Sequence, residues 1–117
     1  MKARINITQR MLNKSIIDAN KSVVAFFREY QPELGYDCIN NGGKNVILAH
    51  YDDGHGEWPT SIRLYRRPRG DKLLSVQGLT KRANAGNVMT FEYDTKSDRI
   101  IVRLELAEPP KEINLIE

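Results

Sequence analysis

The chain has 117 residues, with 18 Lys and Arg against 15 Asp and Glu, and 40% of its residues are hydrophobic. This length suits one compact domain, residues 1–117, and the composition excludes both a disordered chain and a strongly cationic one. No apolar run approaches the roughly 20 residues that cross a bilayer, and the first ten residues lack the apolar core of a signal peptide, so we expect a cytoplasmic protein with no membrane partner.

The first half of the chain predicts a strand, a helix and the start of a hairpin. Apolar and polar residues alternate over 2–8, which is typical of a strand with one buried face. A polar stretch, 9–15, follows the strand. Asn20 can cap a helix that ends near Tyr30, and the turn residues at 40–43 precede a strand over 45–51. The apolar stripe of the helix consists of Val23, Phe26, Phe27 and Tyr30.

The second half predicts four more strands. They are expected over 58–65, 72–77, 88–93 and 99–106. A bend at 66–71 joins the first two, and a short helix over 79–84 precedes the third. The two prolines at 109–110 end the regular structure and leave 108–117 as a possibly flexible tail.

This series of elements predicts a mainly β fold with two short helices, built as a small open pseudobarrel of about six to seven strands. A parallel sheet with crossover helices is excluded, because too few helical segments are present. We expect the core to be anchored by four aromatic residues, Phe26, Phe27, Trp58 and Phe91. The single cysteine, Cys38, excludes an intrachain disulfide and an all-cysteine zinc site, and we expect it to be a buried thiol.

Charge is distributed in four alternating blocks. Residues 1–30 carry six basic and two acidic groups, and residues 31–60 carry one and five. Residues 61–82 carry seven and one, and residues 83–117 carry four and seven. If the two basic blocks meet in space, the protein has one cationic face, which is the electrostatic footprint of a nucleic-acid binder. The alternative is that these charges are unrelated and simply solvated.

Two clusters of possible metal ligands invite a catalytic interpretation, and we favour neither. The segment 50–55 holds two His and two Asp, but it lacks the ligand spacing of a calcium loop. A zinc site needs three or four converging ligands, and turns rich in Asp and Gly look similar to one by chance. Glu92, Asp94 and Lys96 could be taken for a magnesium-dependent nuclease site, yet such residues are ordinary in a surface hairpin. We therefore expect no metal, no cofactor and no catalytic residues.

The order of features over 58–106 resembles the second half of the B3-type DNA-binding pseudobarrel. That family includes plant transcription-factor domains and diverged recognition domains of restriction enzymes. The matching places are occupied by Trp58, Gly78, Leu79 and Phe91. The chain departs from the family at two points, because the usual Gly-Trp is Gly78-Leu79 and the usual Gly-Asp turn is Gly86-Asn87.

The resemblance implies that two arms grip double-stranded DNA in its major groove, one after the first strand and one at the bend between the middle strands. Both arms fall in the basic blocks. The expected DNA-binding residues are Gln9, Arg10, Asn13, Lys14, Ser15, Arg66, Arg67, Arg69 and Lys72. The function expected is that of a stand-alone recognition or regulatory module. The alternatives are a protein-binding module, such as an immunity protein or inhibitor, that uses its cationic face on an acidic partner, and a small metal-dependent nuclease.

Overall fold

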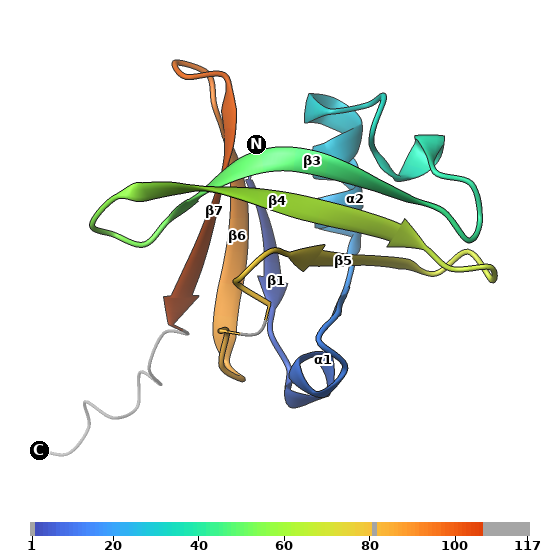
Figure 1. The fold of residues 1–117 in the computed structure, drawn as a ribbon, viewed down its shortest axis with the longest axis horizontal. Coiled ribbons are helices and arrows are strands. Elements are labelled where there is room, and N and C mark those ends of the chain that lie inside the picture. Colours follow the sequence, from blue (N-terminus) through green and yellow to red (C-terminus); the bar gives the residue numbers. More distant parts are fainter. Residues whose placement is uncertain (1, 81, 107–117) are drawn as a thin grey trace, which may run out of the picture.

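The computed structural model describes residues 2–80 and 82–106, which form one curled, open sheet of seven strands, a half-barrel, with two α-helices (Figure 1). This architecture confirms the mainly β fold predicted from the sequence. The strands are β1 (Lys2–Asn6), β2 (Ile17–Asp18), β3 (Lys44–Asp52), β4 (Glu57–Arg66), β5 (Lys72–Val76), β6 (Asn87–Asp94) and β7 (Arg99–Leu106). The helices are α1 (Gln9–Lys14) and α2 (Lys21–Tyr30), and a single 3-10 turn covers Tyr36–Cys38. The predicted tail, 108–117, lies outside the described residues.

The strand order is β1-β6-β7-β3-β4-β5-β2, so β1 and β2 form the two edges of the sheet. All neighbouring strands pair antiparallel except β3 and β7, which are parallel. In Figure 1, β3 and β4 pass in front of β6 and β7, and α2 lies behind β3 and β4. Since β1 and β2 are consecutive strands at opposite edges, the segment that contains α1 spans the open side of the half-barrel.

The core lies between α2 and the inner face of the sheet. Asn20 caps the helix, because its side-chain oxygen accepts a hydrogen bond from the backbone N–H of Val23 at 3.0 Å. The helix then buries Phe26 and Phe27 completely against Phe91 of β6. The Phe91 ring centroid lies 6.3 Å from that of Phe26 and 5.9 Å from that of Phe27. These three aromatic residues are buried as the sequence predicted.

Two residues predicted to be buried are exposed. Trp58 keeps 58% of its surface open, because it stands at the end of the β3–β4 hairpin, near the turn that joins the two strands. Cys38 is exposed because it is the last residue of a 3-10 turn that places Tyr36, rather than Cys38, in the core. The core positions predicted for Trp58 and Cys38 were therefore wrong.

The local structure of two segments was not predicted from the sequence. The arm expected at 9–15 contains helix α1, which Thr8 caps by accepting from the N–H of Met11. The helix expected at 79–84 is replaced by successive turns in its described part, where Leu79 and Thr80 both donate their N–H to the carbonyl of Val76. Whether a short polar segment forms a helix or a turn depends more on capping and tertiary contacts than on its residue types.

Candidate nucleic-acid interface

The outward side of β4 and β5 carries several polar residues. Arg63 is exposed at the centre of β4 and pairs across the sheet with Ser75 of β5 and with Val46 of β3. Tyr65 lies two residues further along β4 and therefore shares this side of the sheet. We call the surface made by Ser15, Arg63, Tyr65, Arg67, Arg69 and Ser75 the basic face.

Helix α1 stands at one end of the basic face. Strand β2 follows α1 directly and pairs antiparallel with β5, with Ile17 opposite Leu74. This register brings the end of α1 toward the last residues of β5, where Ser15 lines a cleft together with Arg63, Ser75 and Gln77. Ser15 ends the helix in the left-handed conformation, with φ 55°. The loop therefore turns sharply at the border of the face.

Four further residues of the predicted first arm lie on α1 and are exposed, and they are Gln9, Arg10, Asn13 and Lys14. Gln9 donates its side-chain N–H to the Asn13 oxygen at 2.9 Å. This pairing is an i, i+4 contact, so the two amides sit on one side of the helix. The arm that the resemblance implies after the first strand is therefore built on a short helix.

The turn between β4 and β5 stands at the other end of the basic face. Gly70 donates its N–H to the carbonyl of Arg67 at 2.7 Å, and Arg67 donates to the carbonyl of Asp71 at 2.9 Å. Pro68 favours this turn through its restricted φ, and Gly70 supplies the required positive φ of 95°. Arg67 and Arg69 are exposed at the tip. Strand β5, which leads from this turn toward α1, is about 16 Å long.

Arg66 and Lys72, the other two basic residues predicted for the second arm, lie on the opposite side of the sheet. They form a cross-strand pair one position beyond Tyr65. The side chain of Arg66 donates to the carbonyl oxygens of Tyr36 at 3.2 Å and Ile39 at 3.3 Å. Lys72 lines a groove with residues of α2 that include Arg28. The alternation of side chains along a strand thus divides one basic block between two faces.

This placement predicts a structural role for Arg66. Arg66→Ala removes charge-assisted hydrogen bonds to two backbone carbonyls and is expected to lower the free energy of unfolding by about 1.5–3 kcal/mol. Arg67→Ala, its exposed neighbour, should change stability by less than about 0.5 kcal/mol. Urea unfolding of both variants measures the difference. Equal stabilities would contradict the anchoring role of Arg66.

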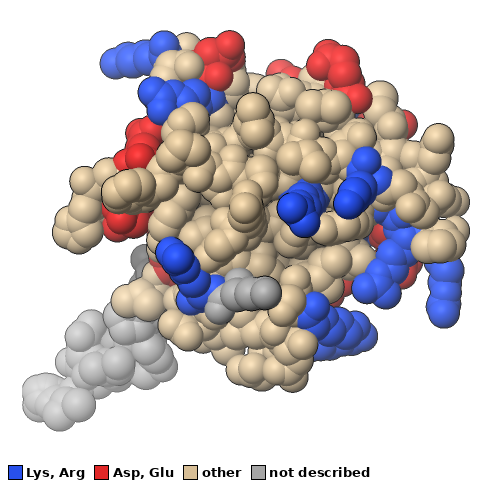
Figure 2. Space-filling model, in the orientation of Figure 1, with Lys and Arg blue, Asp and Glu red and all other residues tan. Residues whose placement is uncertain are grey.

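Several arginines away from the basic face are neutralised by acidic partners. Arg99 pairs with Glu57 at 3.1 Å, and Arg103 bridges Asp52 at 3.0 Å and Glu92 at 2.7 Å. Arg63, Arg67 and Arg69 form no ion pair with any acidic residue of segments 2–80 and 82–106. Figure 2 shows that on the side that carries β4 and β5, Lys and Arg lie at the centre and right, with further ones at the bottom and left. Asp and Glu lie mostly toward the margins, and the centre of this side carries none.

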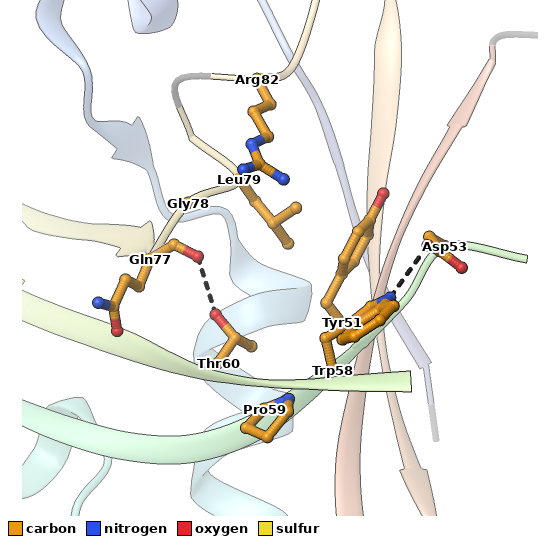
Figure 3. A pocket seen from close by; sticks show the side chains of 9 residues that line it. All are labelled: Tyr51, Asp53, Trp58, Pro59, Thr60, Gln77, Gly78, Leu79 and Arg82. Carbon is orange, nitrogen blue, oxygen red and sulfur yellow. Dashed lines mark hydrogen bonds between the residues drawn. The ribbon is translucent and has the colours of Figure 1, made fainter. Parts of the chain in front are cut away.

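A cleft of about 530 Å³ lies around the end of β5 from the basic face, on the side of the sheet that faces the core, and the sequence does not predict it. Figure 3 shows Tyr51 and Trp58 on one side of it and Leu79 and Arg82 on the other. Tyr51 and Trp58 are cross-strand partners at the end of the β3–β4 hairpin. A Trp at a strand start is usually a core residue, so the sequence offered no signal that this one is exposed.

Asp53 fixes the orientation of the exposed tryptophan. The indole N–H of Trp58 donates to Oδ2 of Asp53 at 3.0 Å. The other carboxylate oxygen accepts the backbone N–H groups of His55 at 2.7 Å and Gly56 at 2.8 Å. The His55 backbone N–H, followed by the Trp58 side chain, holds the pKa of Asp53 below its usual value. The carboxylate therefore stays ionised, and the hydrogen bond to the indole is kept, at neutral pH.

Two findings complete the description of the site. Among the described residues, no group of three or more His, Cys, Asp and Glu is placed to hold a metal ion, and no helix is long and apolar enough to span a bilayer. Comparison with known proteins gives no significant match to a family model, to a curated protein or to a solved structure.

Proposed function

We propose that this protein binds double-stranded DNA through the basic face, as a recognition or regulatory module with a B3-like pseudobarrel. The observation that carries the proposal is the arrangement of α1 and the β4–β5 turn at the two ends of one surface. Arg63, Arg67 and Arg69 provide cationic groups that no acidic residue of the described chain neutralises. Arginine contacts phosphate or guanine through paired hydrogen bonds, and an amide such as that of Gln9 or Asn13 can pair with adenine.

The spacing of the two ends also suits duplex DNA. Strand β5, which runs from the turn to the edge of the basic face beside α1, is about 16 Å long. The major groove of B-DNA is about 12 Å wide, so two projecting elements at this separation can approach its two walls. Arg63 lies between them, where it can meet the backbone or the base edges. We propose a binding module with no catalytic step of its own.

A protein partner is the second candidate, and one observation favours it. Val46 and Leu48 on the outer side of β3 are 46% and 81% exposed, and Val46 is the cross-strand neighbour of Arg63. An exposed apolar pair beside a cation is typical of the surface that an acidic protein contacts. Such a partner would use the β3 side of the basic face.

Arg69→Gln is the substitution that tests DNA binding, with Arg99→Gln as a control that removes the same charge. Arg69 is exposed at the tip of the turn, whereas Arg99 lies at the start of β7 and already pairs with Glu57. On a 20-base-pair duplex selected from a random pool, fluorescence anisotropy should show that Arg69→Gln weakens binding by about 1–3 kcal/mol. Arg99→Gln should bind like the wild type, because an exposed, paired charge contributes little.

The same measurement separates the two candidates. If the wild-type protein binds no duplex at low salt, or if both variants bind as tightly as the wild type, the DNA proposal fails. The acidic protein partner then becomes the better explanation of the basic face. Far-ultraviolet circular dichroism of each variant checks that the fold is retained.

A further inference from the structure

We propose that the cleft between Trp58 and Arg82 receives one unpaired nucleobase of the nucleic acid that lies on the basic face, an inference that rests on the proposed DNA binding. The cleft and the basic face lie on opposite sides of the sheet, because Tyr51 and Trp58 occupy inward positions of β3 and β4, whereas Arg63 occupies an outward one. The two surfaces approach each other around the end of β5. Gln77 and Gly78 line this cleft and also line the cleft that contains Ser15 and Arg63. A strand that leaves the basic face can therefore reach the aromatic cleft by passing around the end of β5 at Gln77 and Gly78.

The aromatic wall is suited to stacking. A tryptophan that is 58% exposed, with its ring held by a hydrogen bond to Asp53, presents a flat apolar surface whose orientation is set before a ligand arrives. Tyr51, its cross-strand partner, extends the same wall (Figure 3). Aromatic side chains bind unpaired bases by stacking, and they do so without strong sequence preference, because every base has a π face.

The opposite wall supplies a cation beside an almost fully buried leucine. Figure 3 shows the Leu79 side chain directed toward Tyr51, with the guanidinium of Arg82 beside it. Arg82 is exposed and forms no ion pair with an acidic group among the residues that the structure describes. A guanidinium can stack on a base or bond to its phosphate. Asp53 lies at the indole end, so the phosphate belongs on the Arg82 side.

The floor and the far wall are tied together, which keeps the cleft open. Thr60 donates its hydroxyl proton to the backbone carbonyl of Gln77 at 2.9 Å. Ser61 donates to the side-chain oxygen of the same glutamine at 3.0 Å. These bonds join β4 to the segment that carries Leu79 and Arg82. A volume of about 530 Å³ lies in the range of small-ligand pockets and leaves room for a nucleobase.

The chain provides its own reporter for this site, because Trp58 is its only tryptophan. The experiment compares three DNA probes with the wild type, Trp58→Leu and Trp58→Phe: a fully paired 16-base-pair duplex, the same duplex with one central unpaired base, and a thymidine 16-mer single strand. We expect the unpaired base and the single strand to quench tryptophan emission. The perfect duplex should quench it much less.

Affinity measured by anisotropy gives the second readout. Trp58→Leu should weaken binding to the two probes with unpaired bases by about 5- to 150-fold, the loss expected from one stacking contact, while binding to the perfect duplex stays unchanged. Trp58→Phe should recover part of this loss. Because Trp58 is exposed, thermal unfolding of the variants should stay close to that of the wild type.

The outcomes for the cleft and for the basic face are distinguishable. If the perfect duplex binds but no probe changes the emission, and Trp58→Leu binds every probe like the wild type, the nucleobase site is overturned while duplex binding stands. An exposed Trp58 would then mark a protein contact. If single strands quench the emission and the duplex does not bind, the cleft is supported and the duplex proposal fails. If no probe binds, both proposals fail.

Discussion

Phe91→Ala is expected to lower the free energy of unfolding by about 3–5 kcal/mol, enough to unfold a marginally stable domain of this size. Phe91 is fully buried on β6 and contacts both aromatic rings that α2 places in the core. Strand β6 pairs with β1 on one side and β7 on the other, so the backbone cannot collapse into the space left by the ring. The cost therefore includes both lost apolar burial and an unfilled cavity.

Leu48→Ala is the matched control for this prediction. Leu48 is also an apolar residue of the sheet, but it is 81% exposed on the outer side of β3. Its replacement should change the unfolding free energy by less than about 0.5 kcal/mol. Urea denaturation followed by circular dichroism measures both variants. A loss below about 1 kcal/mol for Phe91→Ala would place the true core elsewhere.

Duplex affinity is expected to fall about 500-fold between 50 and 200 mM salt, which corresponds to a slope of about −4.5 in log K against log salt concentration. This slope is expected if five exposed cations each neutralise one phosphate. The five are Arg10, Lys14, Arg63, Arg67 and Arg69. Each phosphate that one of them neutralises releases condensed counterions and adds about −0.9 to the slope. A steep dependence is the signature of contacts to the DNA backbone.

Two single-charge variants of one hairpin test which cations contribute to this slope. Arg67 is exposed at the tip of the basic face, whereas Lys72 lies on the other side of the sheet, in the groove beside α2. Arg67→Ala should make the slope shallower by about one unit, and Lys72→Ala should leave it nearly unchanged. If the two variants behave alike, net charge governs the binding and the basic face has no special role.

Most of the buried core of this protein could be predicted from patterns that are local in the sequence. The alternation over 2–8 and the apolar stripe around Phe26 each identify a buried face through a periodicity that only one kind of element produces. Asn20 was recognised as the helix cap for the same local reason, because its side chain bonds to a backbone N–H three residues later. Strand count, the position of α2 and the three buried phenylalanines could therefore be predicted.

The candidate site could be predicted only in part. The arginine-rich turn was found because Pro68 and the arginines beside it are adjacent in sequence. The internal role of Arg66 could not be found, because its partners, the carbonyls of Tyr36 and Ile39, are about 30 residues away along the chain. The side of the sheet on which Lys72 lies depends on the register between β4 and β5, which a single residue of slip would reverse.

The sequence by itself determined a mainly β domain, its aromatic core and two separated basic blocks, since each follows from composition or from short-range periodicity. Only the tertiary structure decided that β2 pairs with β5 and so brings α1 to the basic face, and that Trp58 stands exposed over a cleft. The physical reason is common to both. A side chain's burial depends on which distant segments cover it, and this coverage is set by strand order and register rather than by its own neighbours in the chain.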